Sequence, residues 1–77
     1  MLFRIDPSAD ATIFMQIADN VRTEAAAGRL RSGERLPSAR EVAEMLGVNV
    51  HTVLRAYQEL RDEGLVELRR GRGAVMT

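Results

Sequence analysis

The amino-acid sequence predicts a mainly α fold in which three helices are followed by a small β-hairpin. From residue 12 to residue 63, apolar residues recur at the three- and four-residue spacing of amphipathic helices. Each of these runs starts near a side chain that caps helices and ends at a glycine. Residues 65–77 instead form two short apolar runs around an arginine- and glycine-rich turn, which is the pattern of a hairpin.

The chain has 77 residues, enough for one small domain and too few for an enclosed substrate chamber. It has no cysteine, so disulfides and thiolate metal sites are excluded. No apolar run approaches the ~18 residues of a membrane-spanning helix. The first residues also lack the basic start and long apolar core of a signal peptide. We therefore expect a cytoplasmic protein without a membrane partner.

Eleven arginines balance eleven acidic residues, and there is no lysine. The charges are unevenly spread, because residues 68–77 carry three arginines and no acid. Zero net charge argues mildly against a nucleic-acid partner, since many such proteins are basic. The basic end of the chain argues for one.

Residues 12–27 are predicted to form the first helix. Its apolar stripe consists of Phe14, Ile17, Ala18, Val21 and Ala25. Asp10 or Thr12 is suited to cap the start of this helix. Gly28 is suited to end it, because glycine adopts the left-handed conformation that often follows a helix.

The segments on either side of this helix are predicted to be irregular. Residues 1–11 form an N-terminal arm, and residues 29–37 form a connector to the next helix. We expect Leu30 and Leu36 to point from the connector into the core. Together with Leu36, Arg35 is suited to add a short strand to the later hairpin.

Residues 38–46 and 49–63 are predicted to form two helices joined by a tight turn. Ser38 and Glu41 have the spacing of a capping box at the first of these helices. The turn contains a glycine that ends this helix, a valine suited to burial and an asparagine that can cap the next: Gly47, Val48 and Asn49. With the hairpin at 65–77 as a wing, this order is that of a winged helix-turn-helix.

Catalytic chemistry has little support in this sequence. His51 is the only histidine, so neither a metal triad nor a relay of two histidines is possible. Helix capping explains Ser38 fully, and no glycine-rich loop with a lysine is present to hold a nucleotide. We therefore expect neither an enzyme nor a bound metal or cofactor.

Contact with double-stranded DNA is better supported. The first residues of the second helix of a helix-turn-helix face the base edges in the major groove. Here these residues are Asn49, Val50, His51, Thr52 and Arg55. Asparagine can pair with adenine, valine can meet a thymine methyl, and threonine or histidine can bond a base or a phosphate. Helix capping alone also explains Asn49, and Thr52 could support the same cap, so both readings stay open.

Two further groups are candidate DNA contacts. Arg40 lies in the first turn of the helix at 38–46, where a cation opposes the helix dipole. A phosphate or base contact accounts for it, and an ion pair with Glu44 is the alternative. The predicted wing tip consists of Arg69, Arg70, Gly71, Arg72 and Gly73. Glycines permit close approach to DNA and arginines suit a narrow minor groove, whereas a solvated basic turn is the alternative.

The stretch LPSAREVAEMLGVNVHTVLRAYQELRDEGLVELRRGRGAV closely resembles the DNA-binding domain of GntR-family transcriptional regulators. The preceding ATIFMQIADNVRTEAAAGRLRSGERLPS also fits, so the resemblance covers nearly the whole chain. The resemblance implies a winged helix that binds palindromic operators as a dimer. It also implicates Arg40, the start of the helix at 49–63, and the wing around Arg70 and Gly71.

This chain departs from the commoner pattern of the family at two positions. Many members have arginine where this chain has Val50, and again where it has Leu54. Arg55 stands in the sequence RAY, and in this the chain resembles two branches of the family. One is the short YtrA-like regulators, and the other is the MocR-like regulators that are fused to a pyridoxal-phosphate aminotransferase. Base recognition inferred from the commoner branches therefore does not transfer to these two positions.

We expect a sequence-specific DNA-binding domain of a bacterial transcriptional regulator that acts as a repressor. The family also has a C-terminal domain for effector binding and oligomerisation. This chain stops at Thr77, so we expect a small-molecule effector to act only through a domain that is absent here. A winged helix used for protein–protein contact is the rival function, and zero net charge favours it slightly. An aminotransferase-fused parent is the second alternative.

Overall fold

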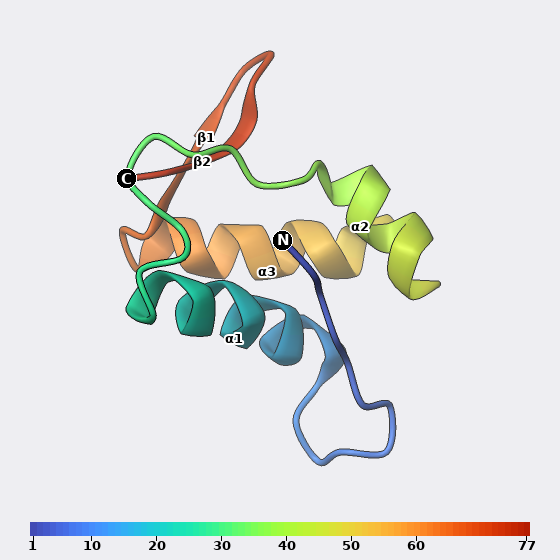
Figure 1. Cartoon of the computed structure of the whole chain (residues 1–77). Coiled ribbons are helices and arrows are strands. Elements are labelled where there is room, and N and C mark those ends of the chain that lie inside the picture. The colour runs from blue at the N-terminus through green and yellow to red at the C-terminus, as the bar shows by residue number, and fades with distance from the viewer.

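The computed structural model describes all 77 residues as three helices and one antiparallel hairpin. The helices are α1 (Ile13–Ala26), α2 (Ala39–Leu46) and α3 (Val50–Asp62), and the strands are β1 (Val66–Arg69) and β2 (Gly73–Met76). Figure 1 shows the hairpin projecting from the helices, with α1 and α2 on different sides of α3. The fold is a winged helix-turn-helix, as the sequence predicts, and the element bounds agree to within one or two residues.

Capping side chains begin each helix. Thr12 caps α1, since its Oγ1 accepts a hydrogen bond from the Met15 amide at 3.4 Å. Ser38 and Glu41 form the predicted capping box at α2, with the Glu41 amide donating to the serine Oγ at 3.1 Å. Asn49 caps α3. Of the two candidates for the α1 cap, Asp10 therefore takes no part.

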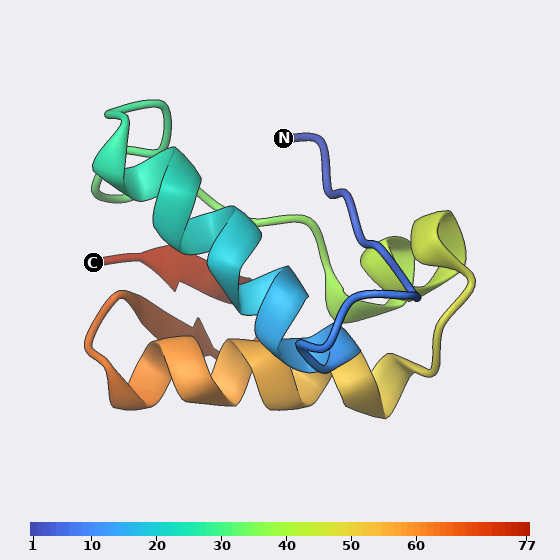
Figure 2. The same cartoon turned by 90° about the horizontal axis from the view of Figure 1, so that it is seen from below.

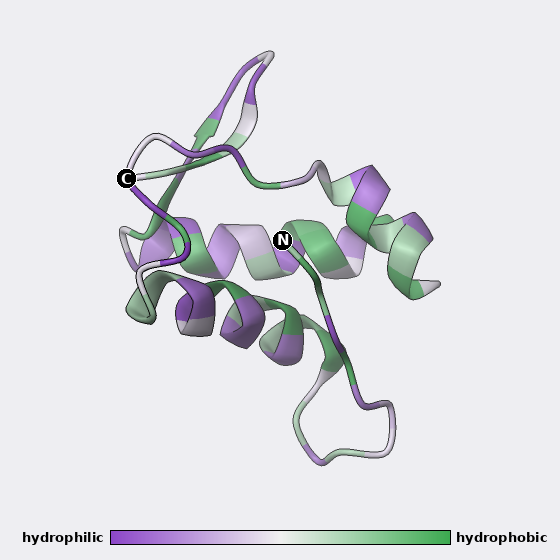
Figure 3. Ribbon diagram, viewed as in Figure 1, coloured by the Kyte–Doolittle hydropathy of each residue, from purple (hydrophilic) through white to green (hydrophobic).

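Helix α3 is the centre of the core, with α1 and α2 packed against it. Figure 2 shows α1 crossing α3 obliquely, with α2 beside the N-terminal end of α3. The buried side chains of α1 and α3 are Ile17, Ala18, Val21, Val53, Ala56, Tyr57 and Leu60. In Figure 3 the hydrophilic colour collects on the outer side of α1 and near the tip of the hairpin. Burial of the apolar faces of the three helices fixes how they pack against one another, and this packing positions the α2–α3 turn.

The Tyr57 side chain ties the connector to α3. Its hydroxyl donates a hydrogen bond to the Pro37 carbonyl oxygen at 2.5 Å, and the residue is only 3% exposed. Burial raises the pKa of the Tyr57 hydroxyl well above its ordinary value. Tyr57 therefore stays protonated and holds the residue just before α2 against α3.

The connector meets β2 at an isolated β-bridge and does not form the short strand that the sequence indicates for Arg35 and Leu36, so the sheet keeps two strands. Arg35 forms a β-bridge with Val75, and the Leu36 amide donates to the Ala74 carbonyl at 2.9 Å. Leu36 is buried as expected, whereas Leu30 is half-buried against the core. The pairing anchors the base of the hairpin to the segment that leads into α2.

The N-terminal arm is part of the folded body. Phe3 is 4% exposed and belongs to the core. The Asn20 amide group brackets Arg4, since its Oδ1 accepts from the Arg4 amide at 3.0 Å and its Nδ2 donates to the Arg4 carbonyl at 2.8 Å. These bonds hold residues before α1 along the surface of that helix. None of the helices is both long and apolar enough to cross a membrane.

Candidate nucleic-acid interface

The start of α2, the middle of α3 and the hairpin meet around one open recess of about 420 Å³. Its lining includes Ser38, Ala39, Leu54, Tyr57, Leu68 and Arg70. The fold thus brings the wing and the first residues of α2 to one recess, whereas Arg40 and the α3 candidates Asn49, Val50, His51, Thr52 and Arg55 do not line it. A second hollow, lined by Ser38 and by Gly71 and Arg72 among others, joins the α2 start to the wing tip.

Arg40 is the second residue of α2 and is exposed to solvent. Its guanidinium makes neither an ion pair nor a hydrogen bond, so the alternative of a pair with Glu44 is not observed. A cation at this position is unfavourable to the helix itself, because it lies near the positive end of the helix dipole. Local stability therefore does not account for Arg40.

The first turn of α3 contains two residues already used by the fold. The Asn49 Oδ1 accepts a hydrogen bond from the His51 amide at 2.8 Å, while the Nδ2 donors of this side chain have no partner within the fold. Val50 is half-buried and packs against the core. His51 is exposed and Thr52 is half-buried. His51 is consequently the side chain of this turn most available to a base edge.

Arg55 is held by an aromatic ring of another helix. Its guanidinium carbon lies 4.0 Å from the centroid of the Phe14 ring of α1, in a cation–π arrangement, while the residue itself remains exposed. This contact directs Arg55 towards α1. It also restricts the side chain before any ligand is bound.

The wing tip contains one paired and two unpaired arginines. Arg69 forms an ion pair with Glu67 at 2.7 Å, as expected for residues two apart on one face of a strand. Arg70 and Arg72 have no acidic partner and are exposed. Gly71, between them, has a φ of 78°, a conformation that L residues with a side chain rarely adopt. The following residue of the predicted tip, Gly73, also has a positive φ and begins β2.

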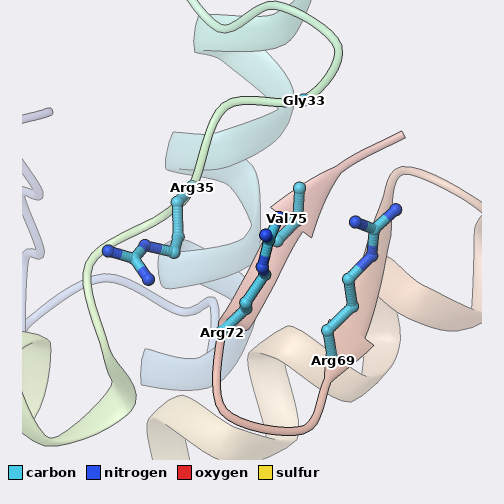
Figure 4. A pocket seen from close by; sticks show the side chains of 5 residues that line it. All are labelled: Gly33, Arg35, Arg69, Arg72 and Val75. Carbon is cyan, nitrogen blue, oxygen red and sulfur yellow. The ribbon is translucent and has the colours of Figure 1, made fainter.

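Arg35 is a candidate interface residue that the sequence reasoning did not include. It lines a hollow on the hairpin together with Arg69 and Arg72, which Figure 4 shows around Val75. The signal was present, because Arg35 precedes a buried leucine in a segment expected to pair with the hairpin. Alternation along that strand places the arginine on the opposite face from Leu36.

Although the net charge is zero, most of the arginines do not form ion pairs. Only four arginines form ion pairs: Arg22, Arg29, Arg61 and Arg69. Arg22 of α1 lies between Asp19 and Glu63, and its hydrogen bond lowers the pKa of the Glu63 carboxyl. Glu24 is similarly held by Arg29, which lowers the pKa of that carboxyl. Two acids of α1, Asp19 and Glu24, are thus paired within the fold, whereas Arg40 at the α2 start and Arg70 and Arg72 at the wing tip have no acidic partner.

A winged helix-turn-helix domain with free cations at its α2 start and wing tip is the class that this structure defines. The chain matches the bacterial regulatory proteins of the gntR family over residues 14–76. It belongs to this family, as the sequence motifs indicate.

Individual relatives come from both branches suggested by the sequence. The transcriptional repressor YtrA of Bacillus subtilis is 37% identical over 76 residues, covering 99% of this chain and 58% of YtrA. The probable rhizopine catabolism regulatory protein MocR of Rhizobium meliloti is 41% identical over 69 residues, covering 90% of this chain and 14% of MocR. Among solved structures, YtrA from Sulfolobus acidocaldarius, a GntR-family transcription factor, superposes with a TM-score of 0.90 at 42% identity. That match covers 100% of this chain and 82% of the other. The chain thus spans little more than half of one curated relative and a small part of the other.

Proposed function

We propose that this chain is the sequence-specific, double-stranded DNA-binding part of a bacterial transcriptional regulator that acts as a repressor. The observation that carries the proposal is the set of unpaired arginines at the α2 start and the wing tip, two segments that line one recess together with the middle of α3. Free cations on segments that adjoin a recognition helix suit the phosphate backbones that border a DNA groove. The repressor named YtrA among the relatives supports the direction of regulation.

The candidate contacts divide into two kinds. Arg40, Arg70 and Arg72 are proposed to bind phosphates or the minor groove, where they supply affinity with little sequence preference. His51 and Thr52 are proposed to read base edges from the first turn of α3. The remaining candidates contribute less freely because each already has a role in the fold: Asn49, Val50, Arg55, Arg69, Gly71 and Gly73.

Palindromic operators and a homodimer are part of the same proposal. Two copies of α3 entering successive major grooves on one side of a duplex would lie about 34 Å apart, one turn of B-DNA. Effector binding and stable dimerisation are assigned to a further domain of the full regulator, in the cytoplasm. The chain is similar to regulators of both the YtrA and the MocR branch. In the alternative to a YtrA-like regulator, the full protein carries an aminotransferase-like domain.

The test is a fluorescence-anisotropy titration of pooled random duplex DNA at low salt, followed by selection of bound sequences. We expect binding that weakens steeply with added salt, together with enrichment of one motif. A double variant, Arg40→Ala with Arg72→Ala, serves as the control for non-specific retention and should lose most of the binding. Absence of binding at low salt would favour the rival function, a winged helix that contacts another protein.

A further inference from the structure

A basic hollow of about 490 Å³ lies on the hairpin, away from α3. Ala74 and Met76 of β2 belong to the core, so Val75 between them points to the opposite face of the sheet. Because Arg35 pairs with Val75 across the β-bridge, its side chain emerges on that same outer face. Figure 4 shows Arg35 on the connector, Arg69 on β1 and Arg72 alongside Val75.

One apolar residue, Val75, lines this hollow together with the arginines. Val75 is only 5% exposed, although it is the one buried residue outside the core cluster. Figure 4 shows the Arg72 side chain alongside Val75, in the manner of arginine stems that lie along apolar surface while their charged ends reach water, whereas the Arg35 side chain extends away from it.

No acidic side chain forms an ion pair with Arg35 or Arg72. Glu67 lies on the same outer face, but its carboxylate is paired with Arg69 at 2.7 Å. Glu41 borders the adjoining hollow with Arg35 and Arg72 and keeps its charge, but it forms an ion pair with neither arginine and its carboxylate accepts from the Ser38 amide in the capping box. Two guanidinium groups, those of Arg35 and Arg72, are left without an ion pair beside both hollows. Their mutual repulsion decreases when an anion binds between them.

We propose that Arg35 and Arg72 together bind one phosphate group on this outer face. Guanidinium groups suit the task because their planar, forked donors match the oxygens of a phosphate. The phosphate is a phosphodiester of the DNA strand beside the wing, or a free phosphate-bearing anion. The first source rests on the proposed function and extends its interface to the connector that precedes α2.

The first experiment compares Arg35→Gln with Arg31→Gln in DNA titrations at several salt concentrations. Arg31 is a matched control, since it lies exposed in the same connector, forms no ion pair and does not line the hollow. If DNA is the source, Arg35→Gln weakens binding about tenfold and lowers the slope of log K against log salt by about 1. Arg31→Gln then changes affinity by less than about twofold, because its charge is remote and screened.

The second experiment follows the arginine Nε–Hε signals by NMR while inorganic phosphate replaces chloride at constant ionic strength. If a free anion is the source, the Arg35 and Arg72 signals shift together in a saturable way, and Arg35→Gln abolishes the Arg72 shift. This result supports the site even where DNA affinity is unchanged. An Arg35→Lys variant tests whether the forked guanidinium donors are needed. It keeps the positive charge, so the salt slope should stay the same while part of the affinity is lost.

Two outcomes separate the inference from the proposed function. Equal losses in Arg35→Gln and Arg31→Gln, with no saturable phosphate shift, would overturn the inference and leave DNA binding in place. Failure of the unaltered chain to bind DNA would overturn the proposed function, while a saturable shift would still support a phosphate site. Thermal unfolding of each variant, with a midpoint close to that of the unaltered chain, excludes loss of the hairpin as the cause.

Discussion

At the scale of single residues, the arginines differ chiefly in whether the fold already uses their charge. Arg69 is paired with Glu67, and Arg55 stacks on Phe14, whereas Arg40 has no partner. The pairing of Arg69 follows from the two-residue period of a strand, so the sequence contained the information. The stacking of Arg55 did not follow from any sequence pattern, since it depends on the angle at which α1 crosses α3.

Replacement of the unpaired arginines tests the proposed backbone contacts. We predict that Arg40→Ala and Arg72→Ala each weaken binding to every DNA sequence, by roughly tenfold, because each removes a charge-assisted contact. Each should also reduce the dependence of log K on log salt by about 1. Anisotropy titrations at four salt concentrations measure both quantities.

Arg4→Ala is the matched control for this pair, since Arg4 is exposed on the N-terminal arm and forms no ion pair. It removes the same charge far along the chain from the proposed interface and should leave the salt slope unchanged. An unaltered affinity and slope in both Arg40→Ala and Arg72→Ala would count against the proposed geometry.

His51 is predicted to determine base preference rather than overall affinity. It is exposed in the first turn of α3, and its amide is the one that Asn49 caps, which fixes the backbone from which the ring projects. Loss of one base-edge contact typically changes discrimination by about 1–3 kcal/mol at a single position. Sequences selected by His51→Ala should therefore differ from those of the unaltered chain at one position in each half-site. An identical selected motif would remove His51 from the reading residues.

At the scale of elements, local signals predicted the helices and the hairpin well. Ser38 with Glu41 marked the start of α2, and Gly47, with a φ of 67°, marked its end. The N-terminal arm was less predictable: Phe3 and Ile5 face the core in alternation with exposed Arg4 and Asp6, but so short an alternation does not show where the arm packs. Side-chain brackets such as that of Asn20 around Arg4 are non-local and leave no pattern in the sequence.

The capping box predicts the effect of one serine on stability. In Ser38→Ala the Glu41 amide loses its acceptor, so the free energy of unfolding should fall by about 1 kcal/mol. Urea denaturation followed by circular dichroism measures this change. Ser32→Ala is the control, since Ser32 is exposed in the connector and forms no side-chain hydrogen bond. Equal stability of the two variants would show that the box contributes nothing.

At the scale of the whole molecule, the zero net charge of the sequence did not predict the unpaired arginines on the surface. The net charge is zero, yet acids of α1 and of the α3 C-terminus are tied up by Arg22 and Arg29. These pairs join positions 41 residues apart in one case, and composition alone does not reveal them. The fold thereby pairs part of the acidic charge with Arg22 and Arg29 and leaves Arg40, Arg70 and Arg72 without acidic partners, which is why net charge was a poor guide to the candidate interface.

The ion pair between Arg22 and Glu63 predicts how the stability of the whole domain depends on pH. Its hydrogen bond lowers the pKa of the Glu63 carboxyl below the ordinary value of 4.5. A lowered pKa in the folded state contributes stability above the unfolded-state pKa, and that contribution is lost as pH falls through the folded-state value. Glu63→Gln should therefore unfold at a lower temperature than the unaltered chain at pH 7.

The difference between the two proteins should shrink as the pH is lowered below about 4.5, and vanish once Glu63 is protonated in the folded state as well. Thermal unfolding by circular dichroism between pH 7 and pH 2 measures it. Glu59→Gln is the matched control, because Glu59 lies one turn earlier on α3 and forms no ion pair. A gap in midpoint that stays constant over this pH range, or one that Glu59→Gln reproduces, would mean that the charge of Glu63 does not link α1 to α3.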